Sequence, residues 1–209
     1  MGARRILKNS SPNFCKCALL TFILGFSNFS LADIFCVSAQ VELDMPPEET
    51  WEIMKDLSIS DKYLPGNRRV EILSKNTSGI GAHRRIHKMK SADNYVDETV
   101  INWTEGEGFT LKLHKDDAVM APFGRAEFTF NIDQTTLGRS LVGLTTIYEM
   151  PPGMLQADAS TLSIAKHSEN KLVAIAAGMK HYYETGIRPT VLDRERLISE
   201  VERVGIKCS

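Results

Sequence analysis

The chain has 209 residues, of which 43% are hydrophobic and 24% charged, a composition typical of an ordinary globular protein with a single domain. Four of the 25 basic residues and none of the 26 acidic residues lie in the first 32 positions, which leaves a body with 21 basic and 26 acidic residues and a net charge of −5. An acidic body without a basic stripe excludes nucleic-acid binding as its role and opposes the binding of phosphate groups.

The N-terminus resembles a targeting segment. A basic stretch from Arg4 to Lys16 precedes an apolar run from Cys17 to Phe29, and Ser30-Leu31-Ala32 offers small residues to a signal peptidase. We therefore expect a signal peptide over residues 1–32, cleavage after Ala32, and export to the periplasm or the medium. The apolar run is shorter than the roughly 20 residues that span a bilayer, so we expect no stable membrane span after cleavage. An uncleaved anchor or a cytosolic start is the alternative.

The body begins with one strand and one short helix. Apolar and polar residues alternate from Ile34 to Met45, which predicts a half-buried strand, and cleavage after Ala39 would cut this strand in two. Pro46 and Pro47 suit the start of a short helix with Trp51 and Met54 on its apolar face. The stretch from Ser58 to Tyr63 could add one more turn.

A run of strand-like segments without a helical break follows. Short turns separate these segments, which predicts an antiparallel meander because parallel strands need long crossovers. The segments are Arg69 to Ser74, Ala82 to Met89, Tyr95 to Trp103, Phe109 to His114, Arg125 to Ile132 and Ser140 to Met150. The longer link from Asp116 to Gly124 is apolar around Phe123 and could fold over the mouth of a cup.

Two helices are predicted after the last strand. The long one runs from about Leu155 to Tyr183, with apolar residues at helical spacing on one broad face, and ends near Gly186. The short one runs from Leu192 to Val204, with Thr190 and Asp193 as N-terminal capping groups.

Two cysteines, Cys36 and Cys208, would remain after signal cleavage. They could form one disulfide in an oxidising compartment. Alternatively, Cys36 is a buried small hydrophobe and Cys208 a tail thiol. The spacing does not decide between these two possibilities.

The ordered set of these segments resembles the polyketide cyclase/dehydrase-type members of the SRPBCC superfamily, which is related to START lipid-transfer domains and birch-pollen allergen proteins. The resemblance rests on Leu43 to Trp51, Tyr63 to Gly66 with Val70 to Leu73, Gly79 to Arg85, Glu98 to Trp103, and Gly178 to Gly186. It implies an α+β helix-grip fold over residues 33–186, in which an antiparallel sheet of about seven strands wraps around the long C-terminal helix and encloses an apolar cavity. Residues 187–209 form a C-terminal extension with the short amphipathic helix.

Arg85 and Glu98 are the polar candidates for the cavity. On adjacent strands they could pair inside the cup and orient a ligand, and Glu98 could act as a general base if burial raised its pKa. The alternative is a solvated outer face or a structural ion pair. The residues that could line the cavity are Tyr95, Trp103, Phe123, Tyr148, Met150 and Met179.

The sequence does not predict a metal site or a cofactor. His83 and His87 are four residues apart, which on a strand separates them by roughly 13 Å, too far for one zinc ion. Phosphate loops, nucleophile elbows and dinucleotide fingerprints are absent from the sequence.

We therefore expect an exported protein that binds or carries a small hydrophobic molecule, with that molecule as its partner. A cyclase or dehydratase that uses Glu98, or a module that binds another protein through the extension, are the alternatives. The sequence does not indicate the oligomeric state or the identity of the ligand.

Overall fold

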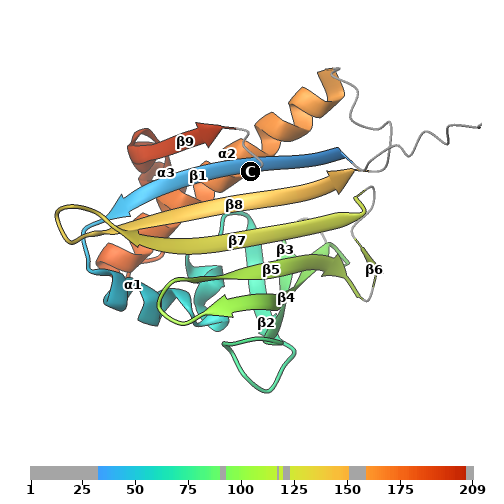
Figure 1. The fold of residues 1–209 in the computed structure, drawn as a ribbon, viewed down its shortest axis with the longest axis horizontal. Coiled ribbons are helices and arrows are strands. Elements are labelled where there is room, and N and C mark those ends of the chain that lie inside the picture. Colours follow the sequence, from blue (N-terminus) through green and yellow to red (C-terminus); the bar gives the residue numbers. More distant parts are fainter. Residues whose placement is uncertain (1–32, 90–92, 117, 120–122, 151–158, 206–209) are drawn as a thin grey trace, which may run out of the picture.

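A computed structural model describes residues 33–89, 93–116, 118–119, 123–150 and 159–205 of the chain. These residues form one antiparallel sheet with helices against one of its faces (Figure 1). The strands lie in the order β2-β3-β4-β5-β7-β8-β1-β9, and β6 pairs with β5 beside this path. The predicted α+β helix-grip architecture is confirmed, with nine strands in the described residues in place of about seven.

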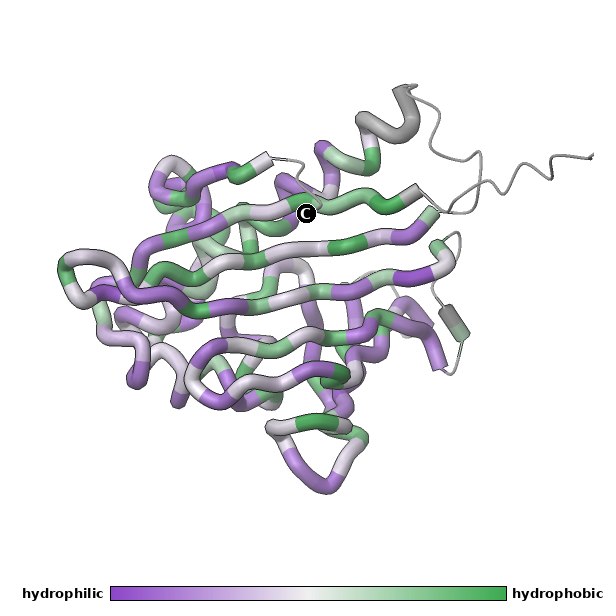
Figure 2. The backbone as a smooth tube through the Cα atoms, in the orientation of Figure 1, coloured by the Kyte–Doolittle hydropathy of each residue, from purple (hydrophilic) through white to green (hydrophobic). Residues whose placement is uncertain are grey.

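Seven of the nine strands fall close to the predicted segments, whereas β6 lies in the expected link and β9 in a segment predicted as a helix. The strands are β1 (Asp33–Leu43), β2 (Asn67–Ile72), β3 (His83–Lys88), β4 (Tyr95–Thr104), β5 (Gly108–Lys115), β6 (Ala118–Val119), β7 (Arg125–Gln134), β8 (Ser140–Met150) and β9 (Val201–Gly205). Along β7 and β8, buried residues alternate with more exposed ones, because one face of the sheet packs on the core and the other meets water. The tube coloured by hydropathy shows the same alternation (Figure 2).

Two short helices follow β1. The first, α1 (Pro47–Met54), has Pro at its first turn, where a missing N–H costs nothing, and buries Trp51 and Met54. The second, η1 (Leu57–Lys62), is a 3-10 helix capped by the Asp56 side chain, and it corresponds to the additional turn expected at Ser58 to Tyr63. Together they cover one end of the sheet (Figure 1).

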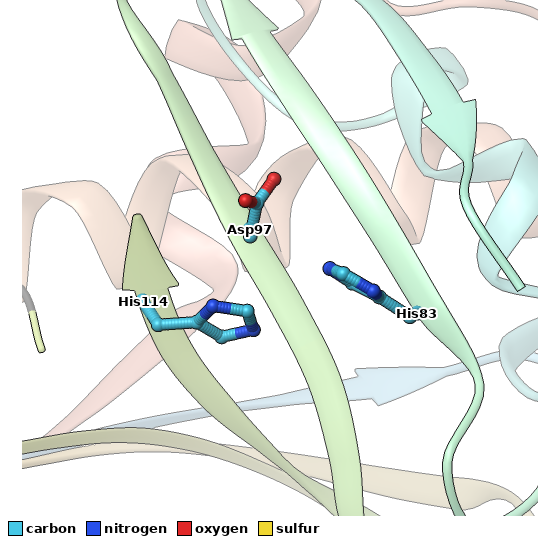
Figure 3. A group of neighbouring side chains, drawn as sticks. All are labelled: His83, Asp97 and His114. Carbon is cyan, nitrogen blue, oxygen red and sulfur yellow. The ribbon is translucent and has the colours of Figure 1, made fainter. Parts of the chain in front are cut away.

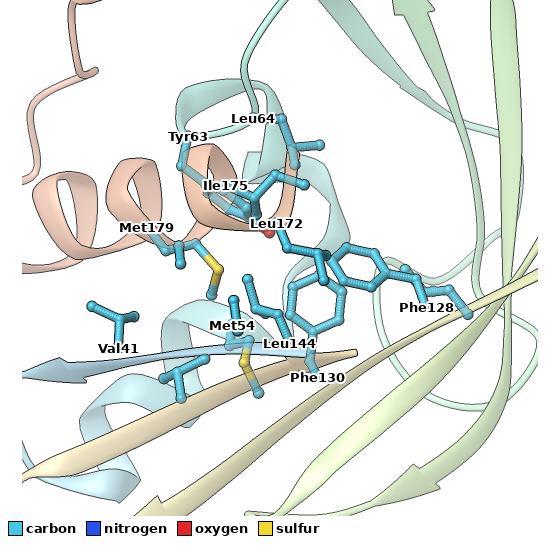
Figure 4. Packing of buried hydrophobic residues seen from close by; sticks show 14 of the residues in the cluster. Val41, Met54, Tyr63, Leu64, Phe128, Phe130, Leu144, Leu172, Ile175 and Met179 are labelled. Carbon is cyan, nitrogen blue, oxygen red and sulfur yellow. The ribbon is translucent and has the colours of Figure 1, made fainter. Parts of the chain in front are cut away.

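The long helix α2 (Ala159–Thr185) packs on β1 and β8. Its Leu172, Ile175 and Met179 are buried against the inner face of the sheet, where they meet Phe128, Phe130 and Leu144 (Figure 4). Burial of such side chains contributes about 1.5–3 kcal/mol each, so this contact supplies much of the stability of the fold. None of the described helices is both long and apolar enough to cross a bilayer.

The extension after Gly186 differs from the prediction. Helix α3 (Val191–Leu197) has the predicted capping box between Thr190 and Asp193, and η2 (Ile198–Glu200) follows it. The expectation that the helix continues to Val204 is wrong, since β9 pairs with β1 and becomes the edge strand. The β-branched pair Val201 and Val204 favours a strand, and the main-chain groups of the β1 edge need partners.

Cys36 is buried in β1 and is disulfide-bonded. Cys208 and the predicted signal segment 1–32 lie outside the described residues, so the Cys36–Cys208 pairing and the cleavage site stay predictions.

Candidate functional site

A buried ion pair lies between the sheet and the helices. The Arg84 side chain on β3 donates from Nε to Glu98 Oε2 on β4 at 2.7 Å, and its Nη2 lies 2.6 Å from the same oxygen. Its Nη1 also donates to the Leu57 carbonyl oxygen at 3.0 Å. Both side chains are almost fully buried, with 1% and 8% of their surface exposed. A permanent cation thus holds the Glu98 carboxylate in place from the inner face of the sheet.

The predicted pair between Arg85 and Glu98 does not form. In the register of β3 and β4, Arg84 lies opposite Glu98 and Arg85 lies opposite Asp97. Successive side chains of a strand point to opposite faces, so Arg85 and Glu98 face opposite sides of the sheet. Arg85 instead donates to both carboxylate oxygens of Asp97, at 2.7 and 2.8 Å.

The ion pair has two buried tyrosines as neighbours. Burial raises the pKa of Tyr63 and of Tyr183, so both phenols stay neutral. Burial alone would lower the pKa of Arg84, but the electrostatic interactions and hydrogen bonds with Glu98 and Tyr63 together outweigh it and raise the pKa. Glu98 is therefore an acceptor for a fixed cation and is poorly placed to remove a proton from a substrate.

A small cavity lies beside this pair, between the sheet and α2. Its volume is about 30 Å³, which is room for two or three water molecules at roughly 10–15 Å³ each. Apolar and polar side chains from both sides line it: Leu64, Ile86, Lys88, Glu98, Leu113, Phe128, Thr146, Tyr148, Ser168, Lys171, Leu172 and Ile175. The cavity therefore combines apolar walls with a basic end, the arrangement that suits an amphipathic molecule.

Lys88 is the most unusual group of this cavity. Burial, together with the nearby charge of Lys171, lowers the pKa of Lys88 to about 8. Its ammonium group donates a hydrogen bond to Asn67 Oδ1 at 3.0 Å. At neutral pH this group is a partly buried cation that lacks a carboxylate partner among the described ion pairs.

A second, larger hollow adjoins the cavity. It measures about 460 Å³ and lies between α2, α3 and the start of β2. Leu64 lines both spaces, and the hydrogen bond from Lys88 joins the first space to Asn67 of the second. Exposed apolar side chains, Met89 and Val191 among them, lie at its rim. The two spaces thus share Leu64 as a common wall residue.

The structure places the predicted ligand-binding residues in four environments. Glu98 and Tyr148 line the cavity, and the Phe123 ring stacks on Tyr148 at 4.4 Å. Met150 and Met179 are buried. Trp103 packs on Trp51 at 4.9 Å near α1, and Arg85 and Tyr95 lie together on the outer face of the sheet.

Sequence reasoning missed Arg84, Lys88 and Lys171. The alternation of β3 carried the signal for two of them, since Arg84, Ile86 and Lys88 share the inward face of one strand. Lys171 lies one position from the buried Leu172 and one turn after Ser168, at the edge of the apolar face of α2. That position could be recognised only once the helix was placed against the sheet.

Comparisons with known proteins agree with this architecture. The family model "Polyketide cyclase / dehydrase and lipid transport" matches residues 35–184. Among solved structures, the crystal structure of Ara h 8.0201 is similar, with a TM-score of 0.52 and 13% sequence identity over 70% of this chain and 98% of that one. A likeness at this identity concerns the fold alone. The search of curated proteins found no match.

The family model covers well over half of the chain, and its expected fold is the one observed. This family and fold support a protein that binds a hydrophobic ligand or acts as a polyketide cyclase. The chain belongs to the polyketide cyclase/dehydrase and lipid-transport family of the SRPBCC superfamily.

Proposed function

We propose that this protein is an exported carrier of a small amphipathic molecule with a hydrophobic body and an acidic headgroup. The observation that carries the proposal is the cavity between the sheet and α2, in which apolar walls end at Lys88 and Lys171. The charge of Lys171 contributes to the lowered pKa of Lys88, so the two cations repel each other. An anionic headgroup between them would remove this repulsion and bind most strongly where water is excluded.

The size of the ligand follows from the two adjoining spaces. The cavity of about 30 Å³ holds only a headgroup, whereas the neighbouring hollow of about 460 Å³ lies within the range of small-molecule sites. A shift of Leu64 would join them. The headgroup would then lie at Lys88 and the hydrophobic body in the hollow beside α3, driven there by roughly 25 cal/mol per Å² of buried apolar surface.

A second candidate function is catalysis of the cyclase or dehydratase type. Lys88 favours it, because an amine with a pKa of about 8 can act as a base near neutral pH. Glu98 does not favour it, because Arg84 holds its carboxylate in an ion pair. Glu98 is the one acidic side chain among the described residues that line the cavity, and Arg84 already holds its carboxylate. Lys88 therefore has no free acidic partner for acid–base catalysis, and carriage remains our proposal.

Export is supported by the sequence pattern of residues 1–32 and by the position of the first strand. β1 begins at Asp33, so cleavage after Ala32 would leave the whole strand, whereas cleavage after Ala39 would leave only its last four residues. Expression of the full chain in a bacterial host, with the mass of the periplasmic product measured, tests this point. A product that starts at Asp33 is expected, and an unprocessed cytosolic product would contradict export.

Binding is tested with defined probes on residues 33–209. We expect 8-anilinonaphthalene-1-sulfonate to gain fluorescence on binding and decanoate to displace it. Lys88→Met should weaken decanoate at least tenfold, whereas Lys75→Met, which changes an exposed lysine outside both spaces, should not. Equal affinity of decanoate and decanol in the wild type would contradict an acidic headgroup.

A further inference from the structure

A cluster of two histidines and one aspartate lies on the outer face of the sheet, opposite the cavity. His83 comes from β3, Asp97 from β4 and His114 from β5, and one ligand atom of each lies within 4.8 Å of the other two. Figure 3 shows the two imidazole rings turned toward each other from either side of β4, with the Asp97 side chain beside them. Along its own strand, His83 has only His87 as a possible second ligand. The sheet supplies the other partners instead.

The register explains why these residues meet. Asp97 lies directly opposite His114 in the pairing of β4 with β5. His83 lies opposite Thr99 in the pairing of β3 with β4, which makes it the diagonal neighbour of Asp97 on the same face. The two imidazole rings lie 5.2 Å apart between centroids. Three potential ligands thus come from three adjacent strands, which are rigid supports.

Asp116 orients two of the three side chains at once. Its backbone has a φ of 51°, in the left-handed region that non-glycine residues rarely adopt. In this conformation its N–H donates to Asp97 Oδ2 at 3.0 Å, and its carbonyl oxygen accepts a hydrogen bond from His114 Nδ1. Backbone strain of this kind persists where the surrounding structure enforces it, and it is common at functional sites.

The hydrogen bond to Asp116 also fixes the chemical form of His114. A carbonyl oxygen can only accept, so Nδ1 carries a proton, and in the neutral form of the ring the lone pair lies on Nε2. Histidines that bind metals use this form, with the other ring nitrogen donating to a carbonyl or carboxylate. Thr99 Oγ1 occupies the neighbourhood of Nε2, at 2.8 Å, and is the group that a metal ion would replace.

Asp97 is likewise held from behind. Arg85 donates to both of its oxygens and the Asp116 N–H to Oδ2, which leaves about one of the four lone-pair sites of the carboxylate for a metal ion. The charge of Arg85 opposes a nearby cation, but it is shared with the Asp116 carboxylate at 3.2 Å and with the Tyr95 ring at 4.0 Å. We expect this charge to moderate the affinity for a metal ion.

We propose that His83, Asp97 and His114 form a binding site for one zinc ion on the outer face of the sheet. Two imidazole nitrogens and one carboxylate oxygen are ligands that zinc accepts at about 2.0–2.2 Å, with a fourth position left for water. Ligand atoms around a tetrahedral ion at these distances lie roughly 3.3–3.6 Å apart, so the present spacing of at most 4.8 Å needs to close by up to about 1.5 Å. The site is separate from the hydrophobic cavity, and it does not depend on the proposed carrier function.

The test is a zinc titration of metal-free residues 33–209, followed by calorimetry and by competition with a fluorescent chelator. We expect one equivalent of zinc to bind and both His83→Asn and His114→Asn to weaken binding at least tenfold. The matched control is His87→Asn on the same strand and face, where the histidine pairs with Glu71 at 3.0 Å, and it should bind zinc like the wild type.

Replacement of zinc by Co²⁺ gives a second readout. The visible absorption of a four- or five-coordinate site should appear in the wild type and in the His87 variant and be lost in the other two. Loss of His114 also removes its bonds to Thr99 and Asp116, so the His83 variant is the independent test, with folding checked by circular dichroism. Absence of stoichiometric binding in the wild type, or equal binding by all four proteins, would overturn the proposal.

Discussion

The substitution Glu98→Gln tests the buried ion pair. Glutamine preserves the shape of the side chain but leaves the Arg84 guanidinium, 1% exposed, without its counter-charge. Removal of one partner of a buried pair costs about 3–5 kcal/mol, a large part of the 5–15 kcal/mol that stabilises a typical domain. With a urea dependence of about 2 kcal/mol per molar, the unfolding midpoint should fall by roughly 1.5–2.5 M.

The matched control is Glu42→Gln. Glu42 pairs with Arg139 at 3.0 Å, and both side chains are more than 40% exposed. Exposed pairs contribute about 0–1 kcal/mol, so this variant should unfold close to the wild-type midpoint. The double variant Arg84→Met with Glu98→Leu removes both charges and should recover most of the loss. Equal midpoints for Glu98→Gln and Glu42→Gln would refute the claim that the pair is desolvated.

Three further predictions concern the helices and Lys88. Gly178→Ala would place a methyl group against the Arg194 guanidinium and the Tyr63 carbonyl oxygen, so it should lower the free energy of unfolding by about 1–3 kcal/mol, as measured by thermal unfolding. The control Lys166→Ala changes an exposed residue and should leave that free energy unchanged. Deletion of residues 187–209 uncovers the edge of β1, so light scattering should show self-association, and a stable monomer would contradict the structural role of β9. The pKa of Lys88 is about 8 in the fold against 10.5 ordinarily, so the unfolded chain holds more protons between these values. The free energy of unfolding should therefore rise with pH by up to about 3.4 kcal/mol over this range. Lys88→Met should lack that part of the rise in urea titrations at pH 7 to 11, and an unchanged profile would show that Lys88 is solvated.

Most of the fold could be predicted because its signals are local. Alternation located β1 and β8 to within two residues, and the proline pair located the start of α1. The segment from Val201 to Val204 could not be assigned from its own pattern, because four residues fit a helix or a strand equally well. Its state is decided by the free edge of β1, which lies about 160 residues earlier in the chain.

The candidate site was harder to predict because it depends on register. Arg84 and Arg85 are adjacent residues with the same side chain, and only the pairing of β3 with β4 decides which of them faces Glu98 and which faces Asp97. A shift of one residue would exchange their roles. The same dependence hid the cluster of His83, Asp97 and His114, which no spacing within a single strand could reveal.

The cavity between the sheet and α2 is the centre of this account, and native mass spectrometry tests it most directly. The full chain would be expressed with its own N-terminal segment, and the processed protein would be purified without detergent. We expect a reproducible additional mass of an acidic hydrophobic molecule, released on denaturation and reduced in Lys88→Met but not in Lys75→Met. A protein that carries no such mass and gains none when incubated with a series of fatty acids would contradict the carrier function.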